Sequence, residues 1–263
     1  MSTCAEVIDR RLAAGDTPLI GYLTAGYPDI DATVRAGKTL IDNGVDIIEL
    51  GLPYSDPGMD GPVIQRTGAQ ALAGGTRTRD VFTAVEELAV TGAPIVVMSY
   101  YNPIFRYGDA AFARDLAAAG GAGVITPDLI PDEGESWIEA AESHDLDHIF
   151  LVAPSSTDKR LDLTVHACRG FVYAASTMGV TGVRAAVDST AETLVTRTRQ
   201  AGGERVCVGL GVSNGDQARE IGHYADGVIV GSALLRALDE GWDALAALTR
   251  DLAAGCAGAR SQS

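Results

Sequence analysis

The stretch Glu49-Leu-Gly-Leu-Pro-Tyr-Ser-Asp-Pro-Gly-Met-Asp-Gly-Pro62 joins an apolar segment to an acidic loop that is rich in glycine and proline. The segment Val45–Leu50 has the length and the flanking residues of an interior strand. Because side chains alternate along a strand, Val45, Ile47 and Glu49 are predicted to share one face. A carboxylate on an apolar face is unfavourable unless it has a partner or a function. Glu49 is therefore a candidate for chemistry.

The loop after this strand carries two further carboxylates, Asp56 and Asp60. Its three prolines restrict the backbone, so we expect a stiff loop. An acid at a strand end and another on the adjoining loop can act as an acid–base pair. The alternative is that Glu49 is neutralised by an arginine in the core and that the aspartates only shape turns. Spacing alone leaves both interpretations open.

Short apolar runs alternate with alanine-rich helical segments along the whole chain. The predicted strands are Leu19–Leu23, Val45–Leu50, Ile95–Ser99, Gly123–Thr126, Ile149–Val152, Phe171–Ala174, Val206–Val208 and Val228–Val230. The predicted helices are Cys4–Ala14, Asp31–Asn43, Val63–Ala73, Arg79–Leu88, Ala110–Ala119, Gly134–Ser143, Lys159–Cys168, Ala191–Gln200, Gln217–His223 and Ala233–Leu252, the last with a break near Gly241. Strict alternation implies parallel strands that are joined by crossover helices.

Eight such units in 263 residues predict an α/β fold, a (β/α)₈ TIM barrel with an extra N-terminal helix. We expect one domain over residues 1–263, with long loops after strands 2 and 6. The alternative is an open doubly wound sheet, but Thr24–Pro28 lacks the glycine fingerprint of that fold. In a barrel, both long loops would lie at the C-terminal face, where active sites are built.

Composition excludes several classes of function. The net charge of −15 is unfavourable for binding nucleic acid. No apolar run is long enough to span a membrane, and the chain does not start with a signal-peptide pattern. The four cysteines are scattered, which is typical of a reducing compartment. We therefore expect a cytoplasmic protein that binds neither nucleic acid nor membrane.

Glycines follow each of the last three predicted strands, at Gly179–Gly182, Gly209–Ser213 and Gly231-Ser232. In barrels, phosphate often binds at the loops after strands 7 and 8, with the N-terminus of a short helix. Glycine lets the backbone approach the anion closely. The three clusters together predict a phosphate site.

The inventory of reactive side chains favours carboxylate chemistry. The only lysines, Lys38 and Lys159, fall on predicted helices, so neither is placed to form a Schiff base at a strand end. The four histidines show no metal-binding cluster, and we predict no metal site. The electron sink must then come from the substrate. A flat apolar ring would fit among residues at the strand ends, namely Tyr22, Met98, Tyr100, Ile125, Leu151, Tyr173 and Leu210.

The stretch 49–62 resembles the signature of the tryptophan synthase α chain in its actinobacterial form. The resemblance covers nearly the whole chain and includes Gly21–Asp29, Tyr100–Pro103, Pro127–Pro131, Gly179–Gly182 and Gly231-Ser232. It implies a barrel that cleaves indole-3-glycerol phosphate to indole and D-glyceraldehyde 3-phosphate. The departures are Gly58-Met59 in place of Leu-Ala, and Met98 and Leu210 where Leu and Phe are frequent.

The resemblance also implies roles for individual residues. Glu49 and Asp60 match the two catalytic acids of the family, and Thr181 matches a loop residue that contacts Asp60 on closure. Residues that match the phosphate site are Gly182, Gly211, Gly231 and Ser232. Residues that match the indole pocket are Tyr22, Met98, Ile125, Leu151, Tyr173 and Leu210.

The resemblance implies a partner as well. Chains of this family pass indole to a β chain in an α₂β₂ heterotetramer, and pyridoxal phosphate is expected in that β chain and not here. The expected docking surface includes Pro53, Asp56, Asn102 and Pro131. Two other interpretations stay open on the residues alone, namely another phosphate-binding barrel such as a sugar-phosphate isomerase, and a subunit that has lost its chemistry.

Overall fold

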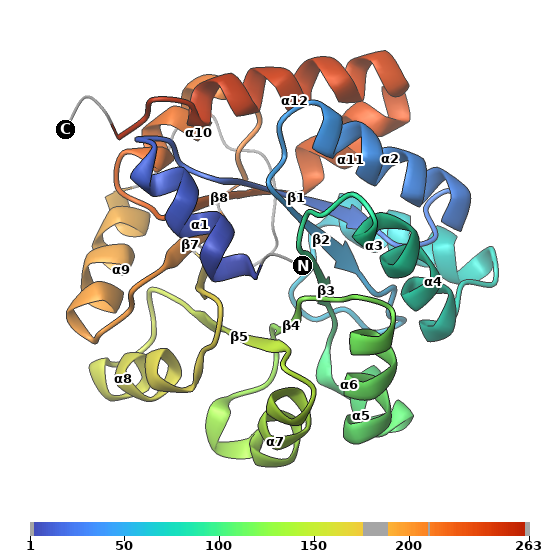
Figure 1. Ribbon diagram of the computed structural model, residues 1–263, viewed down its shortest axis with the longest axis horizontal. Helices are drawn as coiled ribbons and strands as arrows, with labels where there is room; N and C mark the ends of the chain where they lie inside the picture. Colours follow the sequence, from blue (N-terminus) through green and yellow to red (C-terminus); the bar gives the residue numbers. More distant parts are fainter. Residues whose placement is uncertain (1–2, 176–188, 210, 261–263) are drawn as a thin grey trace.

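Eight parallel strands close into a barrel in the order β1 to β8 in the computed structural model, which describes residues 3–175, 189–209 and 211–260 (Figure 1). The strands are β1 (Leu19–Thr24), β2 (Ile47–Gly51), β3 (Ile95–Met98), β4 (Gly123–Thr126), β5 (Asp147–Val152), β6 (Val172–Ala175), β7 (Val206–Gly209) and β8 (Gly227–Val230). Closure comes from β1, which pairs with β2 on one side and with β8 on the other. The predicted (β/α)₈ barrel is confirmed.

Helices surround the barrel, except α1, which lies across one of its ends (Figure 1). They are α1 (Cys4–Ala13), α2 (Ile30–Asp42), α3 (Pro62–Ala73), α4 (Thr78–Ala89), α5 (Tyr101–Tyr107), α6 (Asp109–Ala118), α7 (Glu135–Ser143), α8 (Asp158–Ala167), α9 (Ser189–Gln200), α10 (Gly215–Gly222), α11 (Ser232–Glu240) and α12 (Trp242–Cys256), with a 3₁₀ turn, η1, at Pro131–Glu133. None of the described helices is both long and apolar enough to cross a membrane.

Each predicted helix is present, and the break at Gly241 separates α11 from α12. Gly241 has a φ of 123°, a conformation that glycine adopts at low cost. The sequence prediction missed α5 and η1. Both are short and begin at or near a proline, so neither shows the helical periodicity on which the prediction relied.

The core has two layers. Inside the barrel, side chains from alternate strand positions pack together, among them Ile20, Ile47, Val96, Ile125, Ile149, Cys207 and Ile229. Helix α1 closes one end of this layer with Cys4, Val7 and Ile8. A capping box between Thr3 and Glu6 starts that helix. The second layer lies between the strands and the outer helices.

The face predicted for Val45 is wrong. Strand β2 begins at Ile47, and Val45 precedes it and packs in the outer layer, where its methyl groups lie close to Gly21. The alternation rule holds only from Ile47 onward, so Ile47 points into the barrel as predicted. Glu49, two residues later, also points inward, and it lies closer to the carboxyl ends of the strands.

Candidate active site

Glu49 lies in the barrel wall near the carboxyl end of β2, beside Tyr22 of β1 and Val96 of β3. Glu49 is 1% exposed to solvent, and its Oε2 atom has no hydrogen-bond partner among the described residues. Burial, with a smaller contribution from the charge of Asp60, raises the pKa of Glu49 from 4.5 to about 8. Within the described part of the chain no arginine pairs with it, so the alternative of a neutralised core acid finds no support.

Asp60 stands on the loop between β2 and α3, two residues before α3 begins at Pro62. Burial raises the pKa of Asp60, and a hydrogen bond from the Tyr100 hydroxyl opposes that rise. The same Tyr100 oxygen accepts the backbone N–H of Met59 at 2.8 Å. Tyr100 therefore ties the acidic loop to the end of β3 and sets where the Asp60 carboxylate lies.

Tyrosines surround the two acids. Burial raises the pKa of Tyr22 and of Tyr173, and it raises the pKa of Tyr100 to about 12, so all three phenols stay neutral near pH 7. Two glycines make room for them. A Cβ built on Gly51 would lie 2.1 Å from the Tyr22 hydroxyl oxygen, and one on Gly209 would lie 2.4 Å from that of Tyr173.

The other residues predicted to bind substrate differ in their exposure. Met98 and Leu151 are partly buried beside the inner core layer, at the ends of their strands. Ile125 is fully buried within that layer. The predicted residues Thr181, Gly182 and Leu210 lie outside the described residues.

Three of the four predicted phosphate residues, Gly211, Gly231 and Ser232, follow β7 and β8. Gly211 has a φ of 49°, in the left-handed region that favours glycine. Gly231 precedes α11 and provides no side-chain cap, and Ser232 is the first residue of that helix. The first N–H groups of a helix have no partner within the helix itself. An anion at this end of α11 would therefore meet backbone donors and the positive end of the helix dipole.

The residues predicted to meet a partner lie on neighbouring loops. Asn102 donates from Nδ2 to the Tyr54 hydroxyl at 3.1 Å, which joins α5 to the acidic loop. Asp56 and Asn102 are exposed, Pro131 is partly exposed at the start of η1, and Pro53 is buried. The sequence did not indicate Phe105 on α5 as a surface residue for a partner, although Phe105 is 65% exposed to solvent. This exposure depends on helix α5, which the hydrophobic periodicity of the sequence did not predict.

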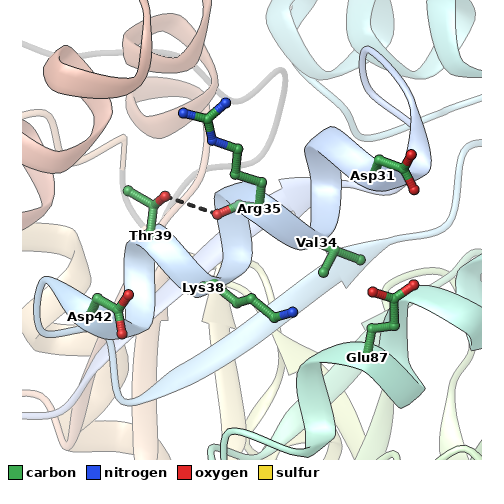
Figure 2. Close-up of a pocket in the computed structure, with 7 residues that line it drawn as sticks. All are labelled: Asp31, Val34, Arg35, Lys38, Thr39, Asp42 and Glu87. Atoms are coloured by element: carbon green, nitrogen blue, oxygen red, sulfur yellow. Dashed lines mark hydrogen bonds between the residues drawn. The ribbon is translucent and has the colours of Figure 1, made fainter.

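Lysines and histidines lie away from the carboxyl ends of the strands. Lys38 lines a surface groove between α2 and α4, together with Asp31, Arg35 and Glu87 (Figure 2). Lys159 is on α8. His148 is buried on β5, where burial lowers its pKa. Among the residues that the structure describes, no group of three or more His, Cys, Asp or Glu could hold a metal ion.

A closed parallel barrel with the buried acid Glu49 and the half-buried acid Asp60 near the carboxyl ends of its strands has the architecture of a barrel enzyme. The sequence pattern of the family described as "Tryptophan synthase alpha chain" matches residues 9–261. The chain belongs to this family, and it is a lyase of tryptophan biosynthesis.

Relatives and solved structures agree with this assignment. The tryptophan synthase alpha chain of Mycobacterium ulcerans is 58% identical over 97% of this chain and 94% of its own. A tryptophan synthase structure from Mycobacterium tuberculosis superposes with a TM-score of 0.94 at 58% identity, and covers 97% of this chain and 98% of that chain. A structure of the tryptophan synthase α₂β₂ complex of Pyrococcus furiosus superposes with a TM-score of 0.83 at 35% identity, over 90% and 98% of the two chains.

Proposed function

We propose that this chain is the α subunit of tryptophan synthase and cleaves indole-3-glycerol phosphate by a retro-aldol reaction into indole and D-glyceraldehyde 3-phosphate. One observation carries the proposal. Glu49 is a buried acid with an unpartnered oxygen and a pKa of about 8, and it lies close enough to Asp60 for the charge of Asp60 to affect that pKa. An acid with such a pKa can both give and take a proton near neutral pH.

In the proposed reaction, a proton adds to ring carbon C3, and the ring becomes a cationic indolenine. Glu49 then takes the proton of the side-chain hydroxyl, and the electrons of that O–H bond form the aldehyde carbonyl. The bond between C3 and the side chain breaks, and its electrons return to the ring as neutral indole. One proton enters and one leaves, so neither a Schiff base nor an oxidant is required. Because Glu49 holds its proton over much of the neutral range, it is also suited to protonate C3 before it acts as a base.

Asp60 has a different part in the proposal. Positive charge that develops on the indolenine nitrogen would be stabilised by a carboxylate that accepts the ring N–H. The hydrogen bond from Tyr100 favours the ionised form of Asp60 and holds it in one orientation. Tyr22, Met98, Leu151 and Tyr173 would contact the ring itself.

The phosphate would be held by backbone N–H groups near Gly211, Gly231 and Ser232, together with Gly182. This mode suits a chain with a net charge of −15 whose lysines lie elsewhere, because helix N-termini bind anions without a cationic side chain. Glycine at these positions keeps the backbone accessible.

The proposal includes a β chain as partner in an α₂β₂ heterotetramer, and pyridoxal phosphate in that β chain. The P. furiosus complex, described as mutually activating, supports this arrangement by its similarity to the present chain. We assign the contact to the loops that carry Asp56, Asn102 and Pro131, at the mouth through which indole would leave. The exposed Phe105 side chain on α5 extends this surface. A cytoplasmic location stays a prediction.

The test is the release of indole from indole-3-glycerol phosphate by the purified chain, alone and with the cognate β chain. Glu49→Gln should lower kcat by at least about 10²-fold, as is typical when a general base or acid is lost. Asp60→Asn should also lower kcat strongly. Glu86→Gln, a change at an exposed position on α4, is the matched control and should keep full activity. If wild-type chain with its β chain released no indole, or if Glu49→Gln kept wild-type turnover, the proposal would be wrong.

A further inference from the structure

Three side chains from three elements form a closed network of hydrogen bonds on the surface of the barrel. Arg66 on α3 donates from Nη1 to the Tyr27 hydroxyl at 2.9 Å and from Nη2 to Asp239 on α11. The Tyr27 hydroxyl in turn donates to Asp239 Oδ1 at 2.5 Å. Tyr27 lies on the connection between β1 and α2. This Arg66 network, formed by Arg66, Tyr27 and Asp239, therefore ties that connection to two helices.

The geometry of the network favours one fixed arrangement. The planar guanidinium of Arg66 engages a different partner with each terminal nitrogen, and its carbon lies 5.5 Å from the centre of the Tyr27 ring. Burial and the hydrogen bond to Asp239 raise the pKa of Tyr27, so the phenol keeps the proton that it donates. The side chains of Arg66 and Asp239 are 42% and 32% exposed, so a single ion pair here would contribute little. Three contacts that close on one another restrain the helices more than one pair does.

One end of the network lies on the helix that begins at the candidate phosphate site. Helix α11 starts at Ser232, directly after Gly231, and Asp239 lies in its last turn. The nine residues of α11 span about 13 Å at about 1.5 Å per residue. The helix has a buried face and packs against α3 and β1. The position of Asp239 is therefore tied to the phosphate site by one short, packed helix.

The other end of the network lies on the helix that follows the acidic loop. Arg66 is next to Gln65, whose Nε2 atom donates to the Asp60 carbonyl oxygen at 2.8 Å. The backbone N–H of Gln65 donates to the Gly61 carbonyl oxygen at 2.9 Å. These two bonds attach the backbone of Asp60 and Gly61 to the first turns of α3. Contacts that fix α3 therefore also fix the point from which the Asp60 side chain starts.

We propose that Arg66, Tyr27 and Asp239 are positioning residues, which hold α11 and α3 together and thereby set the distance between the phosphate site and the Asp60 carboxylate. The proposed substrate carries its phosphate at one end and its indole ring at the other. It can meet both sites at once only if their separation matches its length. This inference rests on the proposed function, because it takes the phosphate and the ring N–H as the groups that the two sites bind.

The experiment compares a ligand that reaches one site with a ligand that reaches both, by calorimetry on the complex with its β chain. Glycerol phosphate carries only the phosphate. Indole with a propyl phosphate side chain carries both groups, and it cannot be cleaved because it lacks the side-chain hydroxyl. Asp239→Ala and Arg66→Met should each weaken binding of the indole ligand by about fivefold and change the affinity for glycerol phosphate by less than about twofold. The value of kcat/KM for indole release should fall by at least as much as the affinity for the indole ligand.

Further variants separate this effect from general damage. Asp9→Ala on α1 breaks another arginine pair, in which Arg205 donates to Asp9 at 2.8 and 2.7 Å, and should leave both affinities unchanged. The double variant with Arg66→Met and Asp239→Ala should match the stronger single variant, because either change already opens the network. In an Asp60→Ala background, Asp239→Ala should have little further effect on the indole ligand, because the contact that the network positions is then absent.

The possible results point to different conclusions. Equal weakening of both ligands by Asp239→Ala would mean that the network only stabilises α11, and no weakening of either would mean that it has no part in the site; either result overturns the inference. Additive effects in the double variant, or an undiminished effect of Asp239→Ala in the Asp60→Ala background, would also overturn it. Wild type that binds neither ligand and releases no indole would instead refute the proposed function.

Discussion

The buried carboxyl group of Glu49 should make the protein less stable as pH rises. Its pKa is raised from 4.5 to about 8 in the folded chain, a difference of about 3.5 units. The folded state therefore holds a proton that the unfolded state has released, and stability falls between about pH 4.5 and pH 8. At about 1.4 kcal/mol per unit, the upper limit of this loss is about 5 kcal/mol. The glutamine side chain of the Glu49→Gln variant carries no charge at any pH, so the variant should not lose this stability as pH rises.

The measurement is the free energy of unfolding by urea for wild type and Glu49→Gln, near pH 5, pH 7 and pH 9. We expect similar stabilities near pH 5 and a growing advantage for Glu49→Gln at higher pH, up to a few kcal/mol. The difference between the two proteins cancels the pH dependence that all other groups contribute. Glu86→Gln, at an exposed position, should show a constant difference from wild type. A constant difference for Glu49→Gln as well would refute the argument that its pKa is raised by burial.

Other positions give sharp tests. Gly51→Ala places a Cβ 2.1 Å from the Tyr22 hydroxyl oxygen, so the ring must move, and kcat/KM for indole release should fall by at least about tenfold. Gly211→Val forces a branched side chain into a φ of 49°, so calorimetry should show glycerol phosphate binding weakened by at least about tenfold; unchanged affinity would remove Gly211 from the phosphate site. Phe105→Ala on the exposed face of α5 should weaken β-chain association by about tenfold or more in sedimentation, whereas Val90→Ala, at another exposed apolar position, should not.

Much of the fold followed from local patterns. The alternation of strand and helix signals predicted the barrel, because parallel strands need crossover connections of that length. The β2 strand, its inward acid and the acidic loop were all predicted from residues 45–62. Most boundaries shifted by one or two residues, and the last helix ends at Cys256, four residues beyond its predicted end. Val45 was placed on the wrong face because the strand begins only at Ile47. Helix α5 was missed because seven residues are too few for the periodicity to show.

The sequence by itself determined which residue types were available. It provided a lone acid on an apolar strand, acids on a proline-rich loop, glycines after the last strands, and lysines only on helices. These features are local, because a few neighbouring residues define each one. They were sufficient to favour chemistry by carboxylates, whereas the barrel was predicted from the alternation of strand and helix signals.

Only the tertiary structure decided how these groups act on one another. The raised pKa of Glu49 depends on burial and on Asp60, and the orientation of Asp60 depends on Tyr100, which follows another strand, β3. The hydrogen bond between the hydroxyl groups of Thr24 and Thr67 joins residues 43 positions apart, and no local sequence pattern predicts it. Desolvation and hydrogen bonding are properties of a whole packed environment, and closure of the barrel creates that environment.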